Sequence, residues 1–276
     1  MATGTLHIVA TPLGNLEDIT LRAIRGLREA SVIACEDTRR TVKLLNRYEI
    51  RTPLSIFHEY NKARAAAGIL RRLRDGESVA LVSDAGTPAI SDPGYELVRE
   101  AIAAGMHVEV VPGPSALVAA IVVSGLPTDH FTFEGFLPNR KEKRRKSLQA
   151  LAEEKRTMIF YESPQRLGAF LADAVEAFGE RRACVVRELT KVHEEILRGT
   201  LPELAAEIEG RESVLGEITI VVGGAPRTVV LSAEEIVRAA LEDASGSSRD
   251  LAREISERTG LPRKEVYAEI LRQRGK

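Results

Sequence analysis

Short apolar runs alternate with amphipathic stretches along the first half of the chain. The runs are apolar throughout, which is typical of strands in a parallel sheet that helices cover on both faces. In the stretches between them, apolar side chains recur every three to four residues, the period of a helix with one buried face. This alternation predicts an α/β fold. The predicted strands are residues 5–10, 31–35, 78–82 and 107–111, and the predicted helices are residues 21–29, 39–48, 62–74 and 95–104.

The second half of the chain begins with the same alternation but then places strands in succession. The predicted strands are residues 131–135, 157–161, 183–187, 196–200 and 217–222, and the predicted helices are residues 115–124, 165–178 and 201–209. No helix-like stretch separates residues 183–187 from residues 196–200, and strands joined by a short connection pair antiparallel. We therefore expect a second sheet of mixed direction.

The last part of the chain is helical in pattern. A cluster of breakers, Gly223-Gly224-Ala225-Pro226, precedes three amphipathic stretches at residues 233–242, 249–258 and 263–272. Their spacing is compatible with a helix-turn-helix. The sequence thus predicts two α/β domains and a small C-terminal helical domain, with boundaries at residues 1–114, 115–226 and 227–276.

Composition narrows this picture only slightly. The 276 residues are 44% apolar and 29% charged, with a formal net charge of -1, so a polyanionic partner must be bound by a local patch. The two cysteines, Cys35 and Cys184, lie far apart and outside any metal-binding spacing, and we expect reduced thiols and no metal site. Residues 1–9 lack the pattern of an export signal, and no window approaches the roughly 20 apolar residues of a membrane span. We expect a cytoplasmic protein that binds no membrane.

The segment that most strongly indicates chemistry is residues 83–94, between a predicted strand and a predicted helix. Ligands of parallel α/β sheets bind at the carboxyl ends of the strands. Small residues such as Gly86 let the backbone approach a ligand, while Asp84 and Asp92 add charge. A rigid turn built from Asp and Pro is the alternative, but the segment is longer than a turn requires. We therefore interpret it as a ligand-binding loop.

Two further loops follow predicted strands in the same way, at residues 10–15 and residues 111–116. Neither carries the G-x-G-x-x-G or Walker pattern of nucleotide-binding loops, and each alone indicates little. Together with residues 83–94, however, three such loops at one edge of a sheet would form the floor of a single pocket.

These loops, in this order and spacing, resemble the tetrapyrrole methylase superfamily, and further motifs resemble its ribosomal RNA branch. The resemblance covers nearly the whole chain, including the helical tail. The motifs that carry it are Thr11-Pro12-Leu13-Gly14-Asn15-Leu16, Cys35-Glu36-Asp37-Thr38-Arg39, residues 84–94, Tyr161-Glu162-Ser163-Pro164 and Glu188-Leu189-Thr190-Lys191.

The resemblance implies two α/β domains with S-adenosylmethionine in the cleft between them, in a homodimer. It also implies the activity, 2′-O-methylation of a cytidine ribose in small-subunit ribosomal RNA, and a partner, either that RNA or the small ribosomal subunit. By motif position, the implied cofactor contacts are Pro12, Ala85, Gly86, Thr87, Ile90, Ser115, Ala116, Tyr161, Glu162, Leu189 and Ile218. The chain departs from the family's G-x-G-P-G at the first loop, where it has Ala10-Thr11-Pro12-Leu13-Gly14.

Acidic residues near the predicted pocket are candidates for a catalytic base. Methyl transfer from a sulfonium to a hydroxyl is an in-line displacement, in which alignment supplies much of the acceleration and a base beside the hydroxyl adds to it. Glu36 and Asp37 follow the second predicted strand, where the resemblance implies an acidic residue at the substrate pocket. Asp84 is the third catalytic candidate and Asp92 an alternative, although both could instead orient the backbone of their loop. Asp37 is equally placed to cap the helix that follows it.

A dense basic run interrupts the second half of the chain. Between Asn139 and Lys146, six residues are basic and one is acidic. Because the run contains no aromatic residues, it would bind phosphates rather than read bases, although a solvated helix face is the alternative. With two arginines near the second strand, the candidate RNA contacts are Arg39, Arg40, Arg140, Lys141, Lys143, Arg144, Arg145 and Lys146.

Two other functions remain open from the sequence. A methyltransferase of tetrapyrroles or other small molecules could use the same fold, with the basic run binding carboxylate groups. A non-catalytic RNA-binding assembly factor would use the α/β domains as a scaffold and would bind no cofactor. The basic run and the helical tail disfavour the first alternative, and the three pocket-forming loops disfavour the second.

Overall fold

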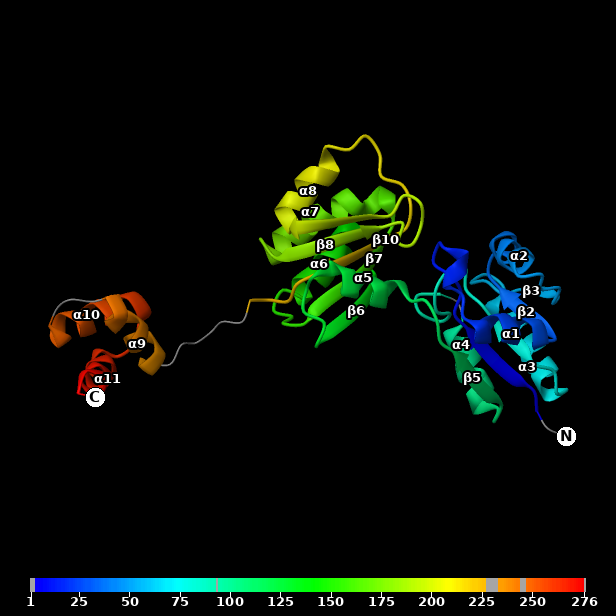
Figure 1. Cartoon of the computed structure of the whole chain (residues 1–276), viewed down its shortest axis with the longest axis horizontal. Coiled ribbons are helices and arrows are strands. Elements are labelled where there is room, and N and C mark those ends of the chain that lie inside the picture. The colour runs from blue at the N-terminus through cyan, green and yellow to red at the C-terminus, as the bar shows by residue number, and fades with distance from the viewer. Residues whose placement is uncertain (1–2, 93, 227–232, 244–246, 276) are drawn as a thin grey trace. The chain divides into compact units, whose positions relative to one another are not determined.

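The computed structural model describes residues 3–92, 94–226, 233–243 and 247–275 (Figure 1). The chain divides into two compact units, Met1–Ala225 and Pro226–Lys276. The first unit contains two five-stranded sheets with their helices, and the described part of the second is helical. In the described ranges, no helix combines the length and the apolar character needed to cross a membrane.

The first sheet is entirely parallel, with its strands in the order β3-β2-β4-β1-β5. Its strands are β1 (Thr5–Val9), β2 (Val32–Cys35), β3 (Leu54–Ile56), β4 (Val79–Leu81) and β5 (His107–Val111). The central strands are apolar throughout because helices cover both faces. On one face lie α1 (Leu21–Glu29) and α2 (Thr38–Arg47), and on the other lie α3 (Lys62–Arg74) and α4 (Tyr95–Ala103). The predicted α/β layers are confirmed, and most element ends agree to within one residue.

The strand order creates a crevice between β4 and β1. The chain leaves β1 toward α1 on one face of the sheet, and leaves β4 toward α4 on the opposite face. The loops after these two neighbouring strands therefore diverge, which is the topological switch point at which open α/β sheets bind ligands. At their base the loops are joined by an isolated bridge between Thr11 and Gly86.

The second sheet is mixed, as predicted, in the order β6-β7-β10-β8-β9. Its strands are β6 (Phe131–Phe136), β7 (Thr157–Glu162), β8 (Arg182–Arg187), β9 (Glu195–Thr200) and β10 (Ile218–Val222). Only β6 and β7 pair parallel. One face carries the main apolar core with α6 (Lys141–Ala150), α7 (Leu167–Phe178) and α8 (Leu201–Glu209), and the other is covered by α5 (Ala116–Ser124).

Three segments of this unit are helical where the apolar pattern is weak. The basic run forms α6, in which only Arg144 and Leu148 are buried, so it lacks the apolar period by which a helix is recognised. Two short 3₁₀ turns, Leu16–Asp18 and Pro164–Arg166, follow the strand-end loops of β1 and β7.

The second unit contains α9 (Ala233–Asp243), α10 (Ser248–Thr259) and α11 (Arg263–Arg274). These helices pack around a small core that includes Val237, Ile255 and Ile270. Gly260 ends α10 in a left-handed conformation with φ of 74°, which glycine adopts without steric cost. The three helices occur where the sequence predicts them; residues 227–232, 244–246 and 276 of this predicted domain lie outside the described residues.

Candidate active site

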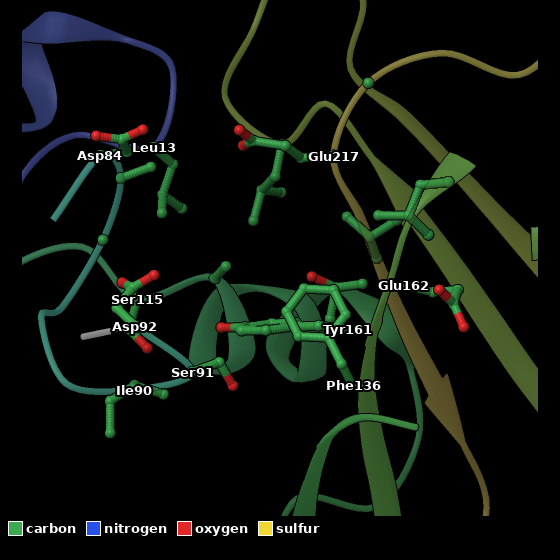
Figure 2. A pocket seen from close by; sticks show the side chains of 18 of the residues that line it. Leu13, Asp84, Ile90, Ser91, Asp92, Ser115, Phe136, Tyr161, Glu162 and Glu217 are labelled. Carbon is green, nitrogen blue, oxygen red and sulfur yellow. The ribbon is translucent and has the colours of Figure 1, made fainter. Parts of the chain in front are cut away.

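A cavity of about 350 Å³ lies at the switch point of the first sheet, within the usual size range of ligand pockets. Figure 2 shows Asp84, Ile90 and Asp92 from the first sheet's loops on one side, and Phe136 and Tyr161 from the second sheet on the other. The lining residues come from the loops after β1, β4, β5, β7 and β8, and from strands of the second sheet, chiefly β7 and β10. The two sheets of the first unit therefore share this pocket.

The three loops predicted to share one sheet edge are hydrogen-bonded to one another. The N–H of Thr11 donates to the carbonyl of Gly86 at 2.8 Å, and the N–H of Gly86 donates back at 3.0 Å. The hydroxyl of Thr87 donates to the carbonyl of Pro114 at 3.1 Å. Gly86 has φ of 79°, and a Cβ there would lie 3.2 Å from Leu13, so this position favours glycine.

Two loops reach the cavity with the same backbone conformation, in which left-handed residues flank a lining residue. In the loop after β4, Ala89 and Ser91 have φ of 69° and 60° on either side of Ile90. In the loop after β8, Glu188 and Thr190 have φ of 51° and 65° on either side of Leu189. A left-handed non-glycine residue costs roughly 1–2 kcal/mol, and such strain concentrates at functional sites. In both loops the residue between the two strained positions lines the cavity.

The wall from the second sheet is aromatic. The ring of Tyr161 meets those of Phe133 and Phe136 edge-on, with centroids 4.8 and 5.7 Å apart. Burial raises the pKa of Tyr161 to about 12, so its hydroxyl stays protonated at neutral pH and cannot act as a base. This wall offers an aromatic surface for a ligand.

Nearly all residues that the resemblance assigns to the cofactor line this cavity. They are Ala85, Gly86, Thr87, Ile90, Ser115, Ala116, Tyr161, Glu162, Leu189 and Ile218. Pro12 is not among the lining residues, and its neighbour Leu13 is. The side chain of Glu162 points away from the cavity (Figure 2) and pairs with Arg166 at 3.1 Å, so any cofactor contact there comes from its backbone.

Acidic side chains gather at one end of the cavity. Asp84 and Asp92 line it, and Glu36 acts electrostatically on both. Burial raises the pKa of Asp92 to about 6, with contributions from the negative charges of Glu36 and Asp84. Burial likewise raises the pKa of Glu36, Asp84 adds to that rise, and His58 opposes it. A carboxylate whose pKa lies near neutrality is suited to general-base catalysis.

Asp37 caps α2 rather than joining this acidic group. Its Oδ1 accepts the N–H of Arg39 at 2.8 Å, and the Arg39 guanidinium pairs with the same carboxylate at 2.7 Å. The hydrogen bond from Arg39 lowers the pKa of Asp37 to about 2, which makes it a weak base. The capping alternative describes the geometry of Asp37, and its lowered pKa disfavours a role as base.

Arg40 joins the two sheets at the rim of the cavity. Its Nη1 lies 3.2 Å from Glu217, directly before β10, and its Nε lies 3.6 Å from Asp84. Lys191 adds an ion pair with Glu217 at 3.2 Å. Arg40 thus holds carboxylates that border the pocket, while Arg39 is mostly exposed.

The structure corrects part of the predicted RNA surface. Arg144 is 4% exposed, and its Nε donates to Asp173 of α7 at 2.8 Å. Arg145 donates to the other oxygen of Asp173 at 2.7 Å and also pairs with Glu176. The expectation that Arg144 contacts RNA is wrong because its guanidinium is buried, and Arg145 is largely engaged in the same ion pairs. The residues of the run that remain exposed are Arg140, Lys141, Lys143 and Lys146.

Other lining residues, such as Phe136 and Glu217, are absent from the sequence-based candidates. Asp92, the alternative base, lines the cavity together with Asp84. Phe136 and Glu217 lie at strand ends of the second sheet. The sequence indicates only that these two residues lie at strand ends. That position predicts proximity to a pocket only once the two sheets are known to face each other.

Comparison with known proteins shows which family this chain belongs to. The family described as Tetrapyrrole (Corrin/Porphyrin) Methylases matches residues 5–205. A Pseudomonas aeruginosa protein named ribosomal RNA small subunit methyltransferase I is 45% identical over 281 residues, covering 100% of both chains. The Thermotoga maritima protein of the same name is 51% identical over 221 residues, covering 80% of this chain and 99% of its own.

Solved structures share the fold at lower identity. Uroporphyrin-III C-methyltransferase from Thermus thermophilus, complexed with S-adenosylhomocysteine, is 21% identical with a TM-score of 0.57, covering 79% of this chain and 97% of that one. A cobalt precorrin-4 methyltransferase is 21% identical with a TM-score of 0.62, covering 79% and 94%. The chain belongs to the tetrapyrrole methylase family and, within it, to the group of proteins named ribosomal RNA small subunit methyltransferase I.

Proposed function

We propose that the protein transfers a methyl group from S-adenosylmethionine to small-subunit ribosomal RNA, at the 2′-hydroxyl of a cytidine. The observation that carries this proposal is the cavity at the switch point, which has acidic side chains at one end. It occurs in a chain whose relative over the full length is named ribosomal RNA small subunit methyltransferase I. The cytidine and its 2′-oxygen are taken from the resemblance of the motifs to the ribosomal RNA branch.

The lining of the cavity fits this cofactor in shape and charge. Small residues such as Gly86 and Ala116 expose backbone groups, and Ile90 and Leu189 offer apolar contact. When bound, S-adenosylmethionine supplies a methyl group on a positively charged sulfonium, and Asp84, Asp92 and Glu217 provide the opposite charge. Because the positive charge disappears during transfer, these carboxylates favour binding of the charged cofactor more than they favour the transition state.

We propose that Asp92 is the general base that accepts the proton of the ribose 2′-hydroxyl. A ribose hydroxyl is a poor nucleophile while protonated, and a positioned base contributes roughly 10²- to 10⁴-fold. The carboxylate of Asp84 already accepts the N–H of Asp37 at 3.0 Å and lies beside Arg40, whereas Asp92 is half-buried among the like charges of Glu36 and Asp84. Asp92 therefore receives the proton, and Glu36 acts on it as a charged neighbour.

Phosphate contacts are assigned to the exposed part of the basic run. Arg140, Lys141, Lys143 and Lys146 are exposed on α6 and its N-terminal side. Clustered basic residues without aromatics position a nucleic acid backbone without reading its sequence. RNA or the small ribosomal subunit, in the cytoplasm, is the proposed partner of this surface.

A homodimer is also part of the proposal. The edge strands β5 and β6 are connected in sequence by α5, and apolar side chains stay exposed on all three elements, among them Val110, Val118, Val122 and Phe131. Exposed apolar patches and unpaired sheet edges are typical of association surfaces. Sedimentation velocity checks this directly: a single species of about 30 kDa at micromolar concentration argues against the dimer.

A methyl-transfer assay with two alternative substrates tests the substrate class. The protein is incubated with methyl-labelled S-adenosylmethionine and, in parallel, with small ribosomal subunits or with porphyrin precursors. We expect label in the RNA alone. Label in the porphyrin precursor alone would establish the small-molecule methyltransferase, and cofactor-free binding of RNA without transfer would establish a non-catalytic assembly factor.

A further inference from the structure

The strand order divides the carboxyl edge of the first sheet into two halves. The loops after β4, β1 and β5 line the cavity. The loops after β2 and β3, the two strands at the other side of the sheet, carry Glu36 and His58. The half that β2 and β3 form contributes only Arg40, near the start of α2, to the lining. We therefore take this half as the side from which the acceptor approaches.

The loop after β3 is a closed turn that presents an aromatic side chain. The N–H of His58 donates to Oδ1 of Asn61 at 2.9 Å, and the N–H of Asn61 donates to Nδ1 of His58 at 3.2 Å. The amide of Asn61 also donates to the carbonyl of Ile56 at 3.0 Å. Between these two residues, Tyr60 is 98% exposed and meets the His58 ring edge-on at 6.0 Å.

A groove of about 560 Å³ continues from this loop between β3 and α3. It is lined by Ile56 and Asn61 at the loop and by arginines along α3. Arg72 is paired with Glu77 at 2.6 Å. Arg64 and Arg71 enter no side-chain hydrogen bond or ion pair with any residue that the structure describes, and both are exposed. Seven residues of helix separate them by roughly 10 Å, so the groove offers two separate cationic contacts.

We propose that Tyr60 and the groove of Arg64 and Arg71 bind the single-stranded RNA that flanks the target nucleotide, with a base stacked on Tyr60 and the phosphates held along α3. An exposed aromatic residue beside basic side chains is the combination that single-stranded nucleic acid binding uses. The basic run of α6 has no such aromatic residue. The arginines along α3 also suit a nucleic acid better than an apolar protein segment.

This inference rests on the proposed function, and its test compares matched variants of the whole protein. Tyr60→Ala removes the stacking surface, and Tyr60→Phe retains it. Arg64→Ala with Arg71→Ala removes the two groove cations. Arg25→Ala with Arg74→Ala removes the same charge from exposed positions of α1 and α3 outside the groove.

The measurements are the KM for small ribosomal subunits, the affinity for a single-stranded oligoribonucleotide against salt, and the affinity for S-adenosylmethionine. We expect the KM for subunits to rise about tenfold in Tyr60→Ala, since stacking one base contributes that much or more, and to be restored in Tyr60→Phe. The groove variant should flatten the dependence of log affinity on log salt by roughly 0.7 for each phosphate that is no longer neutralised. The control pair should do neither, and cofactor affinity should be constant throughout.

Groove and Tyr60 variants that match the control pair in both RNA measurements, while the parent methylates subunits, would overturn the inference and leave the proposed function standing. A parent that binds cofactor but methylates no RNA overturns the proposed function instead. Equal loss of oligoribonucleotide affinity in the groove and control pairs also counts against the inference, because it indicates an effect of net charge alone.

Discussion

Two charged clusters of this protein are organised in opposite ways. In α6, Arg144 and Arg145 converge on the buried Asp173, so opposite charges are matched within 3 Å. At the end of the cavity, Asp92 lies among the like charges of Glu36 and Asp84, and burial raises its pKa to about 6. The matched charges hold α6 and α7 together. The crowded like charges instead help to raise the pKa of Asp92 toward neutral pH. The dense basic run in the sequence draws attention to the first cluster, whereas the proposed catalytic base belongs to the second.

The largest effect should come from breaking the matched cluster. Arg144→Ala leaves Asp173 buried beside a single remaining guanidinium, and removing one partner of a buried ion pair costs about 3–5 kcal/mol. Urea unfolding of the first compact unit measures this loss. Replacing both partners, Arg144→Met with Asp173→Leu, should recover most of it, because two apolar side chains need no charge compensation. A loss of less than about 1 kcal/mol in Arg144→Ala contradicts a structural role.

The crowded cluster should respond in activity rather than in stability. Asp92→Asn is expected to lower the methylation rate by about 10²-fold or more. In the parent, kcat/KM should rise with pH through about 6 as Asp92 loses its proton, and this limb should disappear in the variant. A pH-rate profile of both proteins from pH 5 to pH 8 checks it. An unchanged limb in Asp92→Asn removes Asp92 from the mechanism.

The pH dependence of the free energy of unfolding distinguishes Asp92 further from the structural Asp173. The pKa of Asp92 is raised in the folded protein to about 6, from roughly 4 in an unfolded chain. Protonation therefore favours the folded state, and that stabilisation is present below pH ~4 and is lost as the pH rises through about 6. Asp92→Asn should accordingly be at least as stable as the parent at pH 8. Marked destabilisation at that pH would assign Asp92 a structural role like that of Asp173.

The exposed part of the basic run should have a smaller effect, confined to RNA. Lys141→Ala, Lys143→Ala and Lys146→Ala together should flatten the salt dependence of RNA affinity by roughly 0.7 for each phosphate that these lysines neutralise in the parent. Unfolding should change by no more than about 0.5 kcal/mol, because these side chains are exposed. Salt titrations of parent and variant RNA binding that run parallel would reduce the lysines to a solvated helix face.

The smallest effect expected is that of Glu36→Gln. Removing this negative neighbour should lower the pKa of Asp92, because Glu36 is the largest charge contribution to its rise after burial. The rising limb of kcat/KM should therefore move to lower pH, with cofactor affinity nearly unchanged. A rate lost at every pH, with no shift of the limb, would instead make Glu36 the base.

The fold follows closely from the sequence because its strands are buried and its helices amphipathic. Helices α1 and α3 occupy the predicted residues, and the strand-end loops converge as parallel strands require. The exceptions depend on contacts distant in sequence. Arg144 finds its partner on α7, 29 residues away, and the pKa of Asp92 depends on residues after β2 and β4. Asp37 is ambiguous by nature, because a carboxylate before a helix serves equally as a cap or as a base.

The most direct test of base-assisted methyl transfer to the ribose is nucleoside mass spectrometry of ribosomal RNA after reaction. Small subunits lacking the modification are incubated with S-adenosylmethionine and either the parent protein or Asp92→Asn, and the RNA is digested to nucleosides. We expect 2′-O-methylcytidine with the parent and about 10²-fold slower formation with the variant. A methyl group on a base, or equal rates for the two proteins, would contradict this mechanism.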